Sequence, residues 1–272
     1  MNVRNDPAVL PLVLIAGLFC LSAIPAAAQS RPSTIGRTAD GKPDLNGIWQ
    51  AFNDANWNVE PHTAGPAPNL STGAIGATPP GTGIVEGGRI PYHDRALQQR
   101  EENFLNRATE DPEARCYLPG VPRATYLPQP FQIFQTSGDM LIAYQFAGAV
   151  RAIYMEDPGP APANSWMGWS VGRWEGDTLV VDVTSLNDRT WLDRAGNFHS
   201  DQMHVVERYT PIGPDHLLYE ATIEDPAVFT RPWRIRIPLY RRIEDDARLM
   251  EFKCVEFSEE LIYGHLRRQP DP

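Results

Sequence analysis

From Phe131 to Phe257 the chain consists of short segments in which apolar and polar residues alternate, each ended by glycine, proline or aspartate. Alternation with a period of two residues is typical of β-strands that bury one face. The segments with this pattern are Phe131–Thr136, Met140–Phe146, Val150–Met155, Trp169–Trp174, Asp177–Ser185, Gln202–Thr210, His216–Asp225, Trp233–Arg242 and Arg248–Phe257. Because no helices alternate with them, they predict antiparallel pairing in an all-β domain, a closed lipocalin-like β-barrel or a sandwich.

The part of the chain before these segments has a different character. Residues 29–91 are mostly irregular, with Pro and Gly dense from Val59 to Pro91, although the residues up to Trp49 resemble the entry to a first strand. Residues 92–108 predict one helix, which Asp94 can cap. Its expected apolar face consists of Ala96, Leu97, Phe104, Leu105 and Ala108. We expect a single barrel domain over residues 29–272.

The first 28 residues have the pattern of a secretory signal peptide. A short charged start precedes an apolar run from Ala8 to Ile24, and Pro25-Ala26-Ala27-Ala28 then provides an Ala-x-Ala cleavage site. The alternative is a membrane anchor, because the run nearly reaches the length of a membrane span. Cleavage after Ala28 predicts a periplasmic or secreted protein with no membrane association.

Removal of this segment also removes Cys20 and leaves two cysteines, Cys116 and Cys254. Two thiols in an oxidising compartment favour a disulfide between them. The alternative is a nucleophilic cysteine, but no histidine or other base stands beside either residue. We therefore expect a Cys116–Cys254 disulfide.

The charge of the chain argues against nucleic acid as a partner. The formal net charge is −10 at neutral pH, whereas binding to phosphates needs a clustered basic surface. No phosphate-binding loop, dinucleotide fingerprint or haem-attachment motif is present in the sequence. The expected partner is a small molecule, and no cofactor is expected.

The alternation places one carboxylate on an inward face. In the segment Met203–Thr210, Glu207 shares a face with Met203, Val205 and Tyr209, which are expected to be interior. Burial of an unpaired carboxylate is costly. Glu207 must therefore have a partner or a raised pKa.

Three stretches resemble a large, poorly characterised family of exported bacterial β-rich proteins. They are PDLNGIW at residues 43–49, GWSVGRWEGDTL at residues 168–179 and FHSDQMHVVERY at residues 198–209. The resemblance extends from about Pro43 to Phe257 and implies a shared β-rich fold, without catalytic residues to transfer. Gly47-Ile48-Trp49 is also similar to the Gly-x-Trp of lipocalins, which begins the first strand of a cup-shaped barrel. Some cofactor-free lyases, among them the phenolic acid decarboxylases, use such barrels, an analogy at the level of fold.

The densest group of polar residues lies around residues 191–207. His199 and Asp201 stand in a predicted loop just before the strand that carries Glu207, and an imidazole oriented by a carboxylate is an acid/base pair near neutral pH. The alternative is that Ser200 and Asp201 cap the strand and the histidines are surface residues. We expect no metal site, because His204 and Glu207 are three residues apart on one strand and face opposite ways.

Aromatic and basic residues near this group are candidates for substrate binding. They are Arg151, Trp169, Trp191, Tyr209, Tyr219 and Trp233. Arg151 could instead form a structural ion pair with Glu207. Tryptophans more often fill a core than contact a ligand.

These features favour an exported, cofactor-independent enzyme that acts on a small apolar or aromatic molecule. His199, Asp201 and Glu207 would transfer protons in a lyase (decarboxylase-type) or isomerase reaction, because no nucleophile motif is present. One alternative is a periplasmic carrier of lipophilic molecules. Another is a sugar-active enzyme that uses Glu207 with Asp193 or Asp201, which requires two carboxylates about 5–10 Å apart.

The signal peptide is testable directly. When the chain is expressed with its own leader in a bacterial host, we expect the mature protein to begin at Gln29. Intact-mass measurement and N-terminal sequencing of the periplasmic fraction check this start. A chain recovered with residues 1–28 in the membrane fraction would favour the anchor instead.

Overall fold

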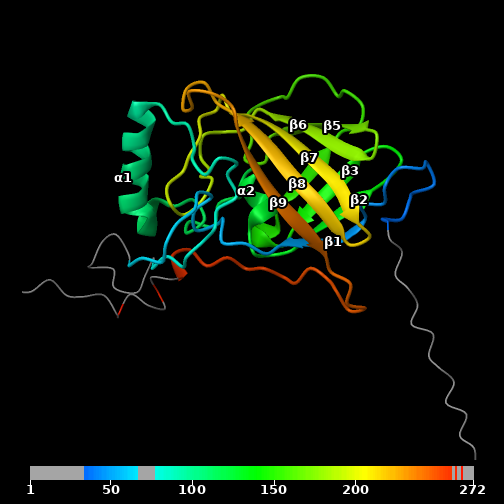
Figure 1. Ribbon diagram of the computed structural model, residues 1–272, viewed down its shortest axis with the longest axis horizontal. Coiled ribbons are helices and arrows are strands. Elements are labelled where there is room, and N and C mark those ends of the chain that lie inside the picture. Colours follow the sequence, from blue (N-terminus) through cyan, green and yellow to red (C-terminus); the bar gives the residue numbers. More distant parts are fainter. Residues whose placement is uncertain (1–33, 67–76, 259–260, 262–264, 266–272) are drawn as a thin grey trace, which may run out of the picture. The chain divides into compact units, whose positions relative to one another are not determined.

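The computed structural model describes residues 34–66, 77–258, 261 and 265. All of them belong to one compact unit, Pro32–Pro272. The predicted signal peptide and Cys20 lie outside the described residues. Figure 1 shows the arrangement of the elements, with strands on one side and a single long helix on the other.

The elements are mostly strands. In chain order they are β1 (Gly47–Ala51), α1 (Asp94–Glu110), α2 (Arg123–Tyr126), β2 (Phe131–Gln135), β3 (Met140–Tyr144), a 3₁₀ turn (Phe146–Gly148), β4 (Val150–Ile153), β5 (Trp169–Glu175), β6 (Thr178–Thr184), β7 (His204–Gly213), β8 (His216–Glu224) and β9 (Trp233–Arg241). All pairings between these strands are antiparallel. The prediction of an antiparallel all-β fold is confirmed.

The nine strands form one sheet that curls into a nearly closed barrel. Their order is β4-β3-β2-β1-β9-β8-β7-β6-β5. The edge strands β4 and β5 meet at Tyr154, the residue just after β4. The backbone N–H of Tyr154 donates to Ser170 O on β5 over 3.0 Å, and the Tyr154 carbonyl accepts from Gly172 N over 2.8 Å. A Cβ on Gly172 would lie 2.7 Å from the Ile153 side chain, so the missing side chain allows β5 to approach this closely.

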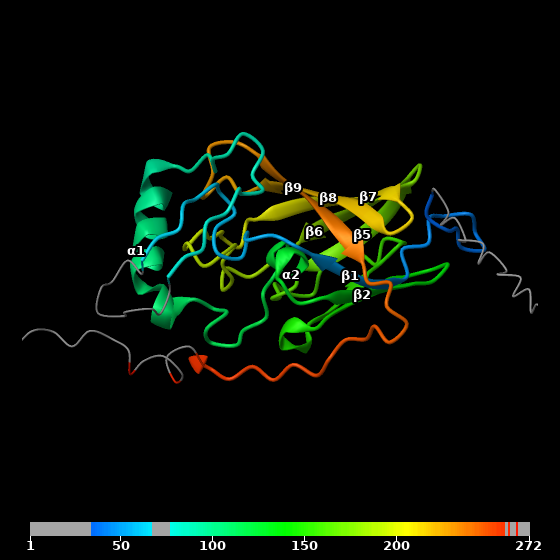
Figure 2. The same cartoon turned by 60° about the horizontal axis from the view of Figure 1, so that its bottom comes forward.

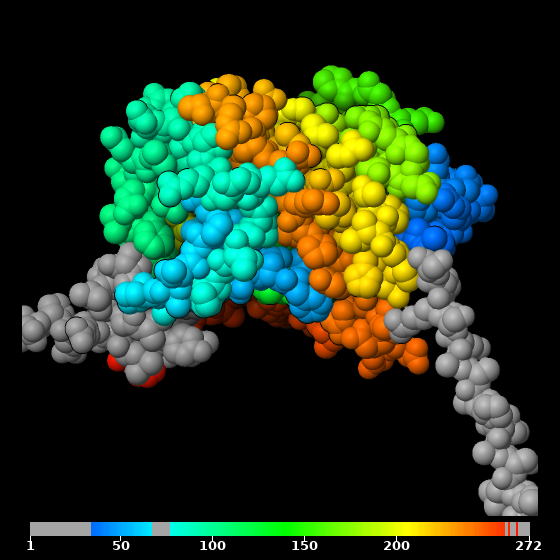
Figure 3. Space-filling model, viewed as in Figure 1, coloured from blue at the N-terminus to red at the C-terminus, as the bar shows by residue number. Residues whose placement is uncertain are grey.

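β1 is too short to cover the whole edge of β9. It pairs with the end of β9 around Leu239–Arg241. Val85 forms an isolated bridge with Ile235, flanked by backbone hydrogen bonds from Glu86 N to Arg234 O and from Arg236 N to Ile84 O. Figure 3 shows the cyan segment lying against the orange residues of β9. The irregular N-terminal region therefore completes the pairing of the last strand.

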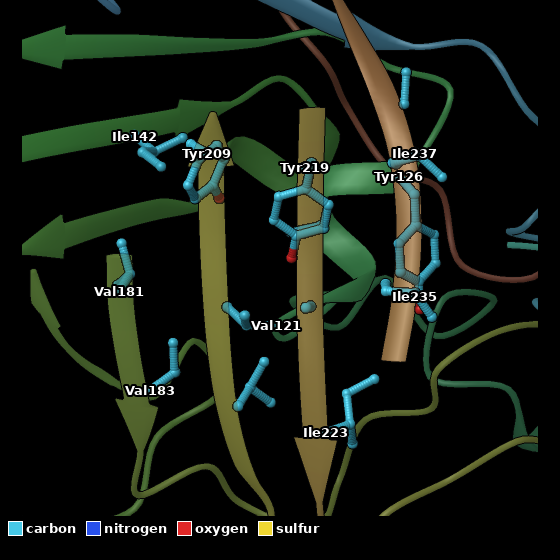
Figure 4. Close-up of a cluster of buried hydrophobic side chains, with 14 of the residues drawn as sticks. Val121, Tyr126, Ile142, Val181, Val183, Tyr209, Tyr219, Ile223, Ile235 and Ile237 are labelled. Carbon is cyan, nitrogen blue, oxygen red and sulfur yellow. The ribbon is translucent and has the colours of Figure 1, made fainter. Parts of the chain in front are cut away.

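A segment that connects α1 to the sheet enters the core. Residues 121–127, which include α2, are all buried and are called the inner segment below. Val121 and Tyr126 lie among the inward-facing side chains of β7–β9 (Figure 4). Arg123 fixes the segment by ion pairs with Asp111 at 3.2 Å and Glu113 at 2.6 Å. Figure 2 shows α2 close to β1.

The predicted inward faces agree with the observed burial. Every second residue from Trp233 to Leu239 in β9, and from Leu217 to Ile223 in β8, is 5% exposed or less. Arg234 and Arg236 are exposed on the opposite face, as expected.

Three sequence-based predictions are wrong. Residues 248–257 alternate but form no strand, because the sheet is already closed and this segment instead crosses the outside, where Phe252 contacts Phe146. In α1 the Leu97 and Leu105 side chains are 48% and 52% exposed, so they do not form a buried face. The helix begins at Asp94, which therefore lies in the first turn and does not cap it.

The crossing C-terminal segment is attached by a covalent bond. Cys116 and Cys254 lie at disulfide distance, with Cα atoms 5.6 Å apart across 138 residues of sequence. In the described part of the chain, no helix has the length and apolar character needed to cross a membrane.

Removal of the disulfide should weaken the fold. For the double variant Cys116→Ser/Cys254→Ser, the chain-entropy model for so long a loop predicts a loss of about 4–5 kcal/mol in the free energy of unfolding. Urea denaturation of the variant and of wild type, each with and without reductant, measures this loss. Reductant should destabilise wild type alone, and equal stability of the two proteins would contradict the expectation.

Candidate functional site

Glu207 lies in the barrel interior and is fully buried. Around it stand polar side chains from several elements, which we call the interior polar cluster. Its members are Glu207 and Tyr209 on β7, Tyr219 on β8, Arg151 on β4, Ser170 on β5, Tyr144 on β3 and Thr125 on α2. Each of these residues is at most 3% exposed.

Both carboxylate oxygens of Glu207 have partners. Oε2 forms an ion pair with Arg151 Nη2. Oε1 accepts hydrogen bonds from the hydroxyls of Tyr219, over 2.7 Å, and Tyr209, over 3.1 Å. Arg151 also donates from Nε to Ser170 Oγ over 2.8 Å.

Strand register explains why these groups meet. Glu207 is paired with Val181 on one side and Ala221 on the other, and Tyr209 is paired with Tyr219 one inward position further along. The small side chain of Ala221 leaves room beside the carboxylate, and the two tyrosine rings lie 5.0 Å apart (Figure 4). Alternation along β7 thus aims Glu207 and Tyr209 at the same region.

Burial and the ion pair set the charge states of the cluster. Burial raises the pKa of the Tyr219 hydroxyl well above its usual value, and the Glu207 charge raises it further. The same two causes raise the pKa of Tyr209. For Arg151, burial would lower the pKa, but Glu207 outweighs it and holds the pKa well above the ordinary value. Both tyrosines are therefore neutral proton donors, and Arg151 stays charged.

Three members of this cluster, Ser170, Tyr144 and Thr125, were not among the residues predicted from the sequence. Ser170 and Tyr144 occupy inward positions of predicted strands, so the alternation could have identified them. Thr125 belongs to the inner segment, which shows neither helical nor strand periodicity. No signal in the sequence pointed to it.

His199 and Asp201 are not joined to Glu207 by any contact among the described residues. His199 is buried, with Nε2 at 2.6 Å from Thr190 Oγ1 and Nδ1 at 2.9 Å from the Ser200 carbonyl. Asp201 is exposed and does not orient the ring. Asp225 takes the position beside this loop instead, accepting from Ser200 N over 2.6 Å.

The expected substrate-binding residues are placed in two groups. Arg151, Tyr209 and Tyr219 surround Glu207. The tryptophans make other contacts. Trp169 lies on the face of β5 opposite Ser170 and donates to Gly159 O, Trp191 forms an isolated bridge with Phe198, and Trp233 packs edge-on against Phe229.

Asp193 is one of the two carboxylates that a sugar-active site could use together with Glu207, and all of its hydrogen bonds are to neighbouring loops. Asp193 accepts from Ala195 N and Asn197 N with one oxygen, and from Val59 N and the Asn197 amide with the other. Burial raises its pKa to about 6, although these donors act in the opposite direction. Asp193 therefore organises loops, and no contact joins it to Glu207 among the described residues.

The described residues contain no cluster of three or more His, Cys, Asp or Glu side chains that could hold a metal ion. His204 Nε2 instead lies 3.0 Å from Asp182 Oδ1 on the outward face, opposite Glu207.

Comparison of the chain with protein-family models, curated proteins and solved structures gave no significant match. The interior polar cluster is therefore the feature of the chain that bears on its function.

The cluster can relay a proton. A tyrosine oxygen can accept a proton from a bound molecule while its own hydroxyl proton passes to Glu207 Oε1, and the reverse movement returns it. The carboxylate therefore acts through Tyr209 or Tyr219 without having to leave Arg151.

His199 should make stability depend on pH. The Ser200 carbonyl can only accept, so Nδ1 carries the proton and the neutral ring accepts from Thr190 at Nε2. Burial lowers the pKa of His199, so the unfolded chain binds this proton more readily than the folded chain, and the stabilisation is lost as pH falls below about 6.5.

The variant His199→Gln retains a donor and an acceptor but does not titrate. We expect the free energy of unfolding of wild type to fall more steeply than that of the variant between pH 7 and pH 5, by up to ~1.4 kcal/mol per pH unit. Urea denaturation across this range measures both slopes. Parallel slopes would show that the histidine is not held neutral.

Proposed function

We propose that this protein is an exported, cofactor-independent enzyme, a lyase (decarboxylase-type) or an isomerase, that moves a proton on a small apolar or aromatic molecule held in the barrel. The observation that carries the proposal is the buried Glu207 carboxylate, which is bonded at once to Arg151, Tyr209 and Tyr219. The residues proposed for catalysis are Glu207 and the two tyrosines. Since no contact joins His199 and Asp201 to Glu207, they have no part in this mechanism.

The energetics of the ion pair favour a functional reason for it. Taking two charges out of water costs several kcal/mol per ion, and replacing a buried pair with apolar residues is often neutral or stabilising. Arg151 and Glu207 are 2% and 0% exposed, so both charges are removed from bulk water. The raised pKa values of Arg151, Tyr209 and Tyr219 around this carboxylate match the perturbed ionisable groups typical of active sites.

In the proposed reaction, one tyrosine oxygen takes a proton from a carbon of the substrate while the tyrosine hydroxyl proton passes to Glu207. The electron pair stays on the substrate, which becomes negatively charged as Glu207 becomes neutral. The positive charge of Arg151 balances Glu207 before this transfer and the substrate after it. Return of the proton to another carbon completes an isomerisation. A decarboxylation uses only the reverse transfer: the bond to the carboxylate carbon breaks, carbon dioxide leaves, and the electron pair left on the substrate carbon takes a tyrosine proton, which Glu207, protonated beforehand from water, replaces.

Export belongs to the same proposal. It is supported by the signal-peptide pattern of residues 1–28 and by the cysteine pair at disulfide distance. The compartment proposed is the periplasm or the medium.

A second candidate is a carrier of lipophilic molecules that performs no reaction. It is favoured by one feature, the three partners of the Glu207 carboxylate, which leave a ligand at most one acceptor position on Oε2.

Catalysis is tested by proton exchange. The protein in deuterium oxide is given aromatic ketones and aromatic 2-enoic acids, and NMR follows deuterium incorporation and loss of carbon dioxide. We expect the double variant Tyr209→Phe/Tyr219→Phe, which keeps the ion pair, and the variant Glu207→Gln each to lower the rate by about 100-fold or more, and at least one of the two single tyrosine variants to lower it as well.

The matched control is Glu220→Gln, on the outward face of β8, which should keep the wild-type rate. Circular dichroism checks the fold of each variant, because Glu207→Gln leaves Arg151 without its partner at a cost of roughly 3–5 kcal/mol. Binding without exchange by wild type would favour the carrier, and exchange unaffected by Tyr219→Phe and Tyr209→Phe would contradict the mechanism.

A further inference from the structure

Three polar atoms inside the barrel make no hydrogen bond of proper geometry with any described residue. They are Arg151 Nη1, Tyr144 Oη and Thr125 Oγ1. Their residues are 2%, 3% and 0% exposed, so bulk water does not satisfy them. Most buried polar atoms in proteins are hydrogen-bonded, and an exception of this kind points to a ligand or water that occupies the place.

The three atoms belong to one neighbourhood. Thr125 and Arg151 both lie within hydrogen-bonding reach of the Tyr144 hydroxyl and act to lower its pKa, which burial raises, and Thr125 has the same effect on the pKa of Tyr209, although none of these contacts has the geometry of a formed hydrogen bond. Tyr144 and Arg151 stand on adjacent strands at inward positions, with Arg151 paired to Ile142. Thr125 comes from the inner segment, so three separate elements supply the group.

The chemistry of these atoms complements an acceptor. The Nη1 atom of Arg151 carries only donor hydrogens, and each hydroxyl can donate. The other arginine nitrogens are used, Nε by Ser170 and Nη2 by Glu207. An oxygen with lone pairs satisfies all three atoms.

The charge of that oxygen follows from the ion pair. The charge of Arg151 is already balanced by Glu207, and both are buried. A carboxylate ligand would therefore add a second buried negative charge without a second positive partner, which is costly in a region of low dielectric constant. A neutral acceptor does not carry this cost.

We propose that Arg151 Nη1, Tyr144 Oη and Thr125 Oγ1 form a binding site for the carbonyl oxygen of a neutral small molecule. The inference rests on the proposed function and favours its isomerase form, because it assigns a neutral substrate class, ketones or aldehydes, to the same interior, whereas a decarboxylase needs a carboxylate. When a proton leaves the carbon beside the carbonyl, negative charge moves to this oxygen, and the three donors stabilise it.

The test is binding, measured by calorimetry on the folded mature chain with three probes of similar size: acetophenone, benzoate and ethylbenzene. We expect acetophenone to bind at least 10-fold more tightly than either of the other two. Tyr144→Phe and Thr125→Val each remove one hydroxyl and keep most of the side-chain volume, and each should weaken acetophenone binding by about 3- to 10-fold. Neither variant should change the affinity for ethylbenzene.

Matched controls are available on the outward face. Tyr240→Phe on β9 and Thr222→Val on β8 make the same chemical changes outside the interior, and both should bind acetophenone like wild type.

Two results overturn the proposal. In one, acetophenone binds no better than ethylbenzene, or not at all. In the other, it binds Tyr144→Phe and Thr125→Val as tightly as wild type, and the three atoms then hydrogen-bond to buried water. Because the measurement needs no turnover, carbonyl binding without proton exchange would sustain this site and refute the enzyme. Proton exchange by the wild-type protein, together with no preference for carbonyl compounds in binding, would sustain the enzyme and refute this binding site.

Discussion

The ion pair between Arg151 and Glu207 is the interaction on which the interior of this barrel depends. It connects β4 with β7, two strands well separated in the sheet, so that it spans the interior instead of joining neighbours. Each partner is surrounded by hydroxyl groups that would be poorly placed in an apolar core without it. Loss of either charge would leave the other buried and uncompensated, which is among the most destabilising changes a core can undergo.

Much of this arrangement could be predicted from the sequence, because strand alternation is a local property. The period of two in β7 places Glu207 with Val205 and Tyr209, and burial of these residues confirms that face. The same reasoning identified the inward sides of β8 and β9. The identity of the partner is not encoded locally, since Arg151 lies 56 residues away in sequence and only the closed sheet brings it to Glu207.

The remainder depends on contacts between distant segments, which local patterns do not encode. Asp201 follows His199 closely in sequence, yet the loop turns it outward and Asp225 takes the place beside Ser200. Residues 248–257 have the alternation of a strand but find no free edge to pair with. Thr125 sits in a stretch without periodicity that becomes interior because Arg123 is bonded to Asp111 and Glu113.

The position of β1 between β2 and β9 affects how the chain can fold during synthesis. β1 is the first strand to leave the ribosome and can pair early with β2, but its other edge stays open until β9 emerges almost two hundred residues later. Throughout that interval the growing chain presents an unpaired strand edge, the kind of surface on which nascent proteins associate wrongly. In a chain built in this order, the pairing that protects this edge of β1 is therefore among the last contacts of the sheet to form.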